Sequence, residues 1–127
     1  MATILVVDDE ERIRNIYRVL LEREGYNVVL SSNIIAARTF MKAIQIDLML
    51  LDINMGELSG DILYEVARCF HRGVRIIVAS VYPVEDQKML IPGAVDHFDK
   101  SEGNKILLEK VRNVLDKGRP VFVNKNI

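Results

Sequence analysis

The stretch "ILVVDDEE", residues 4–11, joins a short apolar run to four consecutive acids. The apolar part has the length and β-branched content of a buried strand. Four neighbouring carboxylates repel one another, so the pattern favours either a bound cation or the first turn of a helix, where unpaired N–H groups carry partial positive charge. The next residues predict a helix that stops at Gly25, with an apolar face made by Ile13, Ile16, Tyr17, Leu20 and Leu21.

This order of strand and then helix repeats along the whole chain. Near-continuous apolar strands that alternate with helices predict an α/β fold, in which a parallel sheet is covered by helices on both faces. The helix at 83–90 is predicted to be a short stub, because Pro92 and Gly93 follow it. The predicted strands are 3–7, 26–30, 47–51, 74–79 and 94–98, and the other predicted helices are about 33–43, 60–71 and 102–117.

Composition limits the classes of function. The 127 residues are 50% hydrophobic with a net charge of −1, which predicts one folded domain at 1–118, followed by a tail at 119–127, and argues against an electrostatic grip on nucleic acid. Cys69 is the single cysteine, so an internal disulfide is impossible and a reducing cytoplasm is expected. The chain has no apolar run of membrane-spanning length, so we expect no membrane insertion.

Polar side chains follow four of the five predicted strands. Asp8 and Asp9 follow the first, Asp52 the third and Ser80 the fourth, while the fifth leads to Lys100. The carboxyl ends of parallel strands meet at one edge of a sheet, where open α/β sheets bind their ligands. The sequence therefore predicts a site of acids, a hydroxyl and an ammonium, which are groups suited to a metal ion and a phosphoryl group.

Each of these residues also has an ordinary structural explanation. Asp9 and Ser80 could cap the elements that follow them, and Lys100 could simply neutralise a buried Asp52. Together they describe a reaction, because crowded carboxylates stay ionised around Mg²⁺, and one of them can act as a nucleophile on phosphorus. Asp52 is the best-placed acceptor, while Mg²⁺, Lys100 and Ser80 would neutralise and position the transferred group.

In order and spacing, the motifs "VVDDEE", "LLDINM", "IIVAS" and "DHFDK" resemble those of the receiver domains of bacterial two-component response regulators, over about residues 2–117. The resemblance implies a flavodoxin-like receiver fold with strand order 2-1-3-4-5. It implies that Asp52 is the phosphorylated residue. It also implies that Mg²⁺ is held by Asp8, Asp9, Asp52 and the backbone carbonyl of Asn54.

The same resemblance implies how the chain works. A histidine kinase or a histidine phosphotransfer protein would donate the phosphoryl group, and Ser80 would move to meet it as a switch residue. The chain would not be an enzyme with a separate substrate, but a phosphoacceptor that assists its own phosphoryl transfer and dephosphorylation. Because the sequence shows no output domain after 127, the signal is expected to leave by contact with a downstream protein whose identity the sequence does not indicate.

Three positions depart from the family pattern. Ser101 follows Lys100 where proline is usual, which predicts either a trans peptide bond with a reshaped loop or a strained cis bond. Gly56 stands where the family commonly has Met-Pro, which loosens that loop. His97 occupies the switch position usually held by Tyr or Phe, and its ordinary interpretation is a half-exposed strand residue. These changes fall on the output side of the domain.

Other functions were weighed against this one. A dehalogenase-type phosphatase needs a second acid two residues after Asp52, but Asn54 stands there. The chain also lacks the glycine-rich loops of nucleotide-binding proteins. The remaining alternative is a receiver-shaped interaction module that acts through its surface without phosphate. For the opening acids, Asp8 and Asp9 are predicted to form the cation site, while Glu10 and Glu11 are predicted to be helix-start charges that point away from it.

Overall fold

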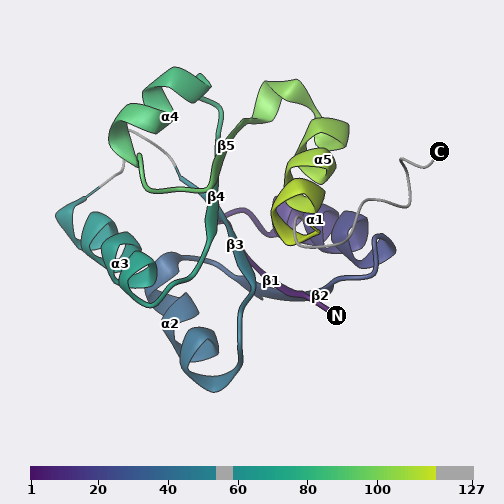
Figure 1. The fold of residues 1–127 in the computed structure, drawn as a ribbon, viewed down its shortest axis with the longest axis horizontal. Coiled ribbons are helices and arrows are strands. Elements are labelled where there is room, and N and C mark those ends of the chain that lie inside the picture. The colour runs from purple at the N-terminus through teal and green to yellow at the C-terminus, as the bar shows by residue number, and fades with distance from the viewer. Residues whose placement is uncertain (54–58, 117–127) are drawn as a thin grey trace, which may run out of the picture.

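A computed structural model describes residues 1–53 and 59–116, in which five strands alternate with five α-helices (Figure 1). Each predicted strand and helix is confirmed to within about two residues at the ends that the structure describes. The elements are β1 (Thr3–Val7), α1 (Glu11–Arg23), β2 (Asn27–Ser31), α2 (Ile34–Ala43), β3 (Leu48–Asp52), α3 (Gly60–His71), β4 (Ile76–Ser80), α4 (Val84–Leu90), β5 (Asp96–Asp99), the 3₁₀ turn η2 (Lys100–Glu102) and α5 (Asn104–Leu115).

The five strands form one parallel sheet in the order β2-β1-β3-β4-β5. This confirms the predicted doubly wound topology. Each strand except the last returns to the sheet through a helix, because parallel strands need a crossover connection. The chain moves from β1 to β2 in one direction and later to β3 on the other side of β1, so the strand order reverses at the carboxyl ends of β1 and β3, the place where such sheets bind ligands.

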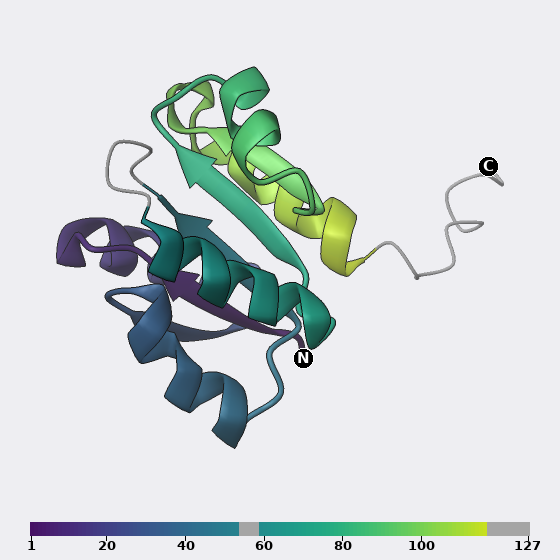
Figure 2. The same cartoon turned by 90° about the vertical axis from the view of Figure 1, so that its left-hand side faces the viewer.

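Two apolar layers hold the sheet between its helices. Residues of α2 and α3 pack on one face, which Figure 2 views from the front, and residues of α1 and α5 pack on the other. Strand side chains alternate between these layers: Leu51 and Val78 belong to the first, and Leu50 and Ala79 to the second. Both faces of each central strand are therefore dry, which explains why the strands are almost continuously apolar.

The loop after β5 has a trans peptide bond at Ser101, which is one of the two predicted outcomes. Lys100 and Ser101 are joined by a trans peptide bond, and the chain continues as the turn η2. The Asp99 carboxylate accepts hydrogen bonds from the Ser101 N–H and hydroxyl at 2.9 and 2.7 Å, and the Glu102 carboxylate accepts one from the Asp99 N–H at 3.0 Å. These reciprocal bonds replace the rigidity that a proline would supply.

The surroundings of His97 differ from the prediction. The side chain was expected to be half exposed, but only 4% of it is exposed, so this prediction is wrong. β5 lies at the edge of the sheet, but α4 packs beside it and covers it. The His97 Nε2 atom lies 2.7 Å from the carbonyl oxygen of Ile91, the residue that ends α4. The short α4 itself is confirmed.

Some predictions fall outside the described residues. Asn54, Gly56 and the tail at 119–127 are among the residues that the structure does not describe, so their predictions stay untested. Within the described ranges, no helix combines the length and the apolar composition needed to cross a bilayer.

The packing of α5 can be tested with one pair of leucines. Leu107 is fully buried against the sheet, so Leu107→Ala should lower the free energy of unfolding by about 2–5 kcal/mol through lost burial and a residual cavity. Leu63 on α3 is 40% exposed, and Leu63→Ala should cost less than about 1 kcal/mol. Urea unfolding followed by circular dichroism measures both, and equal losses would contradict the two-layer packing.

Candidate functional site

Three charged side chains from three different strands meet at the carboxyl edge of the sheet. The Lys100 Nζ atom lies 2.8 Å from Asp52 Oδ1 and 3.5 Å from Asp8 Oδ2. Asp8 comes two residues after Val6, Asp52 two after Leu50 and Lys100 two after Phe98, and these three apolar residues all belong to the layer under α1 and α5. Alternation along the strands therefore directs the three charges to the same side of the sheet.

The position of Asp8 is set by the start of α1. Its Oδ1 atom accepts a hydrogen bond from the Glu10 N–H at 2.8 Å, and its backbone carbonyl accepts one from the Arg14 guanidinium at 2.8 Å. Asp8 is only 1% exposed, and its Oδ2 atom has no hydrogen-bond partner among the described residues. A buried carboxylate oxygen without a hydrogen bond is costly, and it is directed toward the Lys100 and Asp52 groups.

The four acids at residues 8–11 are not arranged as the two pairs that the sequence predicted. One carboxylate oxygen each of Asp8, Asp9 and Glu10 lie within 4.8 Å of one another. Glu10 therefore does not point away from the cluster, and this part of the prediction is wrong. The reason is that Glu10 is the extended residue before α1 rather than part of the helix, whereas Glu11 is confirmed as a charge in the first turn.

The donor set fits a small divalent cation. Mg²⁺ prefers a few carboxylate or carbonyl oxygens and keeps several waters. Asp8 supplies a buried oxygen that lacks a hydrogen bond, Asp9 and Glu10 supply exposed oxygens beside it, and Asp52 lies across the shared contact with Lys100. Asn54, the fourth predicted ligand, lies outside the described residues.

The electrostatics of the site are dominated by burial. Burial, and after it the nearby Asp8 carboxyl, raise the pKa of the Asp52 carboxyl to about 7, although the Lys100 ammonium acts in the opposite direction. Burial also works against the charge of Lys100, but Asp52 and Asp8 outweigh it, so the pKa of Lys100 is raised. Without a further cation, two carboxylates and one ammonium leave Asp52 at the limit of ionisation near neutral pH.

Ser80 lies next to this cluster but is engaged elsewhere. It is fully buried at the end of β4, one residue beyond Ala79, which pairs with Asp52. Its Oγ atom accepts a hydrogen bond from the Tyr82 N–H at 3.1 Å. Among the predicted site residues, Lys100 thus contacts both Asp8 and Asp52, and Asp9 lies next to Asp8. The Ser80 hydroxyl is instead hydrogen-bonded to the loop that leads to α4.

Two neighbours of the site were missed from the sequence. Tyr17 was assigned only to the apolar face of its helix, yet its pKa is raised by burial and is also affected by the charges of Lys100, Asp52 and Asp8. Arg14 holds the Asp8 carbonyl from the first turns of α1. The sequence offered one signal for both residues: each has a polar group and lies on the helix that begins directly after the acids.

The family model for the response regulator receiver domain matches residues 4–112. The chain belongs to this family. A response regulator protein TrrA from Thermotoga maritima, solved in complex with Mg²⁺ and BeF, is 31% identical, with a TM-score of 0.77 over 91% of this chain and all of that one. The sporulation initiation phosphotransferase F of Bacillus subtilis is 26% identical over 95% of this chain and 96% of its own length.

Several relatives of this receiver domain are much longer. The alginate biosynthesis transcriptional regulatory protein AlgB of Pseudomonas syringae is 33% identical over 100 residues, and the match covers 76% of this chain but 22% of that protein. The chain thus spans about a fifth of the length of such relatives.

The raised pKa of Asp52 predicts a pH-dependent stability. Between pH 4 and 7 the folded chain keeps a proton that the unfolded chain releases, so the free energy of unfolding falls as pH rises and levels off above about 7. Asp52→Asn removes this charge and, in EDTA at pH 8, should stabilise the chain by on the order of 2–4 kcal/mol, since one pKa unit corresponds to about 1.4 kcal/mol.

This gain should shrink to a small remainder at pH 4, where Asp52 is protonated in the folded state and, with an ordinary pKa of 3.8, only partly ionised in the unfolded state. Urea unfolding at the two pH values measures it. Asp61→Asn is the matched control, because Asp61 is exposed in the first turn of α3 and should change stability by less than about 0.5 kcal/mol at either pH. The same gain at both pH values, or none, would contradict the electrostatic account of the site.

Proposed function

We propose that this receiver domain is a phosphoacceptor switch in a two-component or phosphorelay system, with Asp52 as the phosphorylated residue. The observation that carries the proposal is the contact of Asp52 with Lys100, which also contacts Asp8, at the edge where the strand order reverses. A carboxylate held beside an ammonium and an acidic cation site has the parts that phosphoryl transfer needs, namely a positioned nucleophile and neutralising charge.

In the proposed reaction, an Asp52 carboxylate oxygen forms a bond to phosphorus while the bond from phosphorus to the donor breaks. The donor is a phosphohistidine, and its imidazole leaves with the electron pair of the broken bond. Lys100 favours the ionised form of Asp52 and then pairs with a phosphoryl oxygen. When bound, Mg²⁺ would neutralise charge on the transferred group, held by Asp8, Asp9, Asp52 and the Asn54 carbonyl. The Ser80 hydroxyl would donate a hydrogen bond to the phosphoryl group.

The proposed role is that of a phosphoacceptor and not of an enzyme. It takes no separate substrate as an enzyme would, but assists its own phosphoryl transfer and its later dephosphorylation, in which water attacks phosphorus and Asp52 is released. Crowded charge at the site supports both steps, since the same groups that stabilise the entering phosphoryl group also stabilise its loss.

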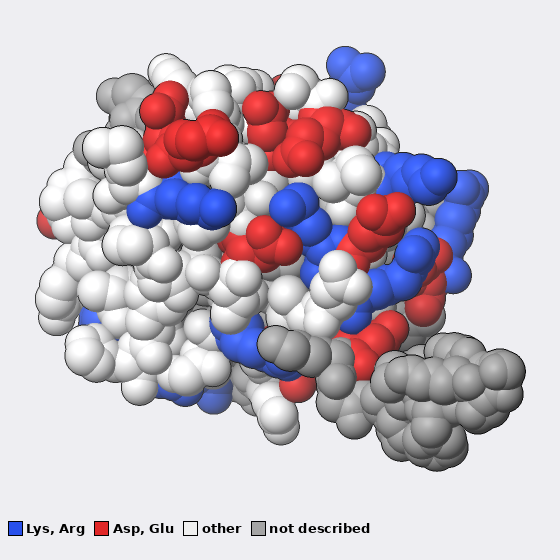
Figure 3. All heavy atoms as spheres, turned by 45° about the horizontal axis from the view of Figure 1, so that its top comes forward, with Lys and Arg blue, Asp and Glu red and all other residues white. Residues whose placement is uncertain are grey.

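Partners are proposed from chemistry and from the relatives. A histidine kinase, ThkA, was solved in complex with the response regulator TrrA, whose chain in that complex is 32% identical to this one, and we propose a histidine kinase or histidine phosphotransfer protein as the donor here. A downstream protein would receive the signal by contact. On the face in Figure 3, charges of both signs gather at the top and right, while the left-hand part is largely uncharged. Mixed charge beside an uncharged area suits a protein partner better than a nucleic acid, which would need a strongly basic surface. We propose that both proteins are cytoplasmic.

The central prediction is covalent labelling of Asp52. With acetyl phosphate and Mg²⁺, the wild-type chain should gain the mass of one phosphoryl group, and Asp52→Asn should gain none, because it lacks the nucleophile. Intact-mass spectrometry measures both. An unlabelled wild type, or equal labelling of the variant, would favour the alternative of an interaction module that does not use phosphate.

The opening acids provide a second, matched test. Asp9→Ala should abolish Mg²⁺-dependent labelling and the rise in melting temperature that Mg²⁺ causes, because it removes a ligand of the cation. Glu11→Ala is the control, since Glu11 is an exposed helix residue outside the acid cluster, and it should behave nearly as the wild type. Labelling by acetyl phosphate and thermal melts with and without Mg²⁺ give the answer. Equal loss in both variants would show that only net charge matters.

A further inference from the structure

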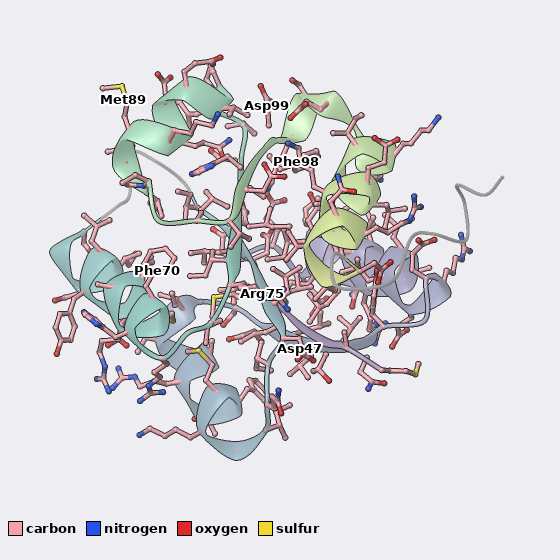
Figure 4. The ribbon with its side chains drawn as sticks, in the orientation of Figure 1. Asp47, Phe70, Arg75, Met89, Phe98 and Asp99 are labelled. Carbon is pink, nitrogen blue, oxygen red and sulfur yellow. The ribbon has the colours of Figure 1, made fainter. Side chains whose placement is uncertain are left out.

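Helix α4 is held to the domain by a polar residue. Gln87 is its single buried residue and has no exposed surface. Its neighbours Lys88 and Met89 are exposed, and Figure 4 shows Met89 pointing outward from α4, away from β5. The seven-residue helix has one further anchor, Ile91 at its end, which is 2% exposed in the apolar layer under α2 and α3. Within the helix itself, the hydrogen bonds of the Gln87 carboxamide decide where it lies.

The Gln87 side chain makes two hydrogen bonds to separate segments. Its Nε2 atom donates to the carbonyl of Tyr82 at 2.8 Å and to the carbonyl of Phe98 on β5 at 2.9 Å. Two carbonyl acceptors determine the orientation of the amide, because only its nitrogen can donate. The Oε1 atom is then buried without a partner among the described residues. Such an atom is costly, so this arrangement is less stable than a fully satisfied one would be.

These bonds continue to the candidate site. The Tyr82 N–H donates to the Ser80 Oγ atom at 3.1 Å, and the Tyr82 carbonyl accepts from Gln87. Ser80, Tyr82, Gln87 and Phe98 therefore form one unbroken chain of hydrogen bonds from the end of β4, through the loop before α4, to the edge of β5. A shift of the Ser80 hydroxyl acts directly on the N–H of the residue whose carbonyl holds Gln87.

We propose that Gln87 is the positioning residue that couples Ser80 to the placement of α4. This inference rests on the proposed function, because it needs a phosphoryl group on Asp52 to draw the Ser80 hydroxyl away from Tyr82. The freed Tyr82 then moves its carbonyl, and Gln87 loses one of its two bonds. Since this amide is the buried anchor of α4, the helix loosens from β5.

The other hydrogen bond between α4 and β5 lies outside this chain. It joins His97 Nε2 to the carbonyl of Ile91 at the far end of the helix and has no link to Ser80. It can hold the end of α4 while the start moves. The structure thus assigns the two ends of α4 different roles: Gln87 responds to the site, and His97 retains the helix.

Hydrogen exchange followed by mass spectrometry tests the coupling. In the wild type, Mg²⁺ with beryllofluoride should raise amide exchange in 81–91 by roughly threefold or more, as α4 opens locally. Gln87→Met keeps the shape but cannot donate, so exchange there should already be fast without the ligand, and the ligand-dependent change should fall to less than half. The variant should still gain the mass of one phosphoryl group from acetyl phosphate, because Gln87 makes no contact with Asp52, Lys100 or the acids that would hold the cation.

Lys88→Met is the matched control, since it places the same side chain one residue on at an exposed position, and it should behave as the wild type. Ser80→Ala, compared at the same occupancy of ligand, should also reduce the change, and adding it to Gln87→Met should reduce it no further, because both break one chain. If Gln87→Met does not fold, Gln87→Asn replaces it, as its shorter amide cannot reach both carbonyls.

A full ligand-dependent change in a folded Gln87 variant, or additive losses with Ser80→Ala, would overturn the coupling while leaving the proposed function intact. Failure of the wild type itself to take up phosphate on Asp52 would overturn the proposed function and the coupling with it. The two failures are therefore distinguishable in one set of samples.

Discussion

The parallel pairing of β1 with β3 is the constraint on which the rest of the structure depends. Because both strands run in the same direction, Asp8 and Asp52 leave the sheet at the same edge, and neither can be withdrawn without exposing an apolar strand. β4 and β5 extend the sheet on the same side as β3, which brings Lys100 across to both carboxylates. The two carboxylates and the ammonium are thus held together by strands whose buried side chains are apolar.

This arrangement works against stability and in favour of chemistry. Burial and the neighbouring Asp8 raise the pKa of Asp52, so the domain carries a charge that its surroundings disfavour. On the proposed function, a divalent cation bound beside these crowded carboxylates would lower the pKa of Asp52 and make it fully anionic. The stress at the site is concentrated in the side chains, since none of the described residues other than glycine has a positive φ.

Helix α4 is held to the domain differently from the other helices. Most elements are fixed by apolar layers, as α5 is by Leu107, but α4 is anchored by the Gln87 carboxamide and by the His97 hydrogen bond. Hydrogen bonds exchange partners more readily than a packed core rearranges, which is why the proposed coupling places the movement in this short helix. The same shortness leaves apolar side chains such as Met89 exposed, where a protein partner can contact them.

The sequence by itself determined the order of elements, the parallel sheet and the strand-end residues Asp8, Asp9, Asp52, Ser80 and Lys100, because apolar periodicity and the position of a residue after a strand are local properties. Only the tertiary structure decided that Glu10 joins the acids, that His97 is buried, and that Ser80 bonds to Tyr82 rather than to the charged cluster. These depend on cap geometry, on which helix covers an edge strand, and on side-chain alternation between two faces. The Glu10 and Ser80 contacts join residues that are neighbours in sequence, and the burial of His97 joins two elements, but all three need a backbone geometry that only the packed fold fixes. No residue pattern records that geometry.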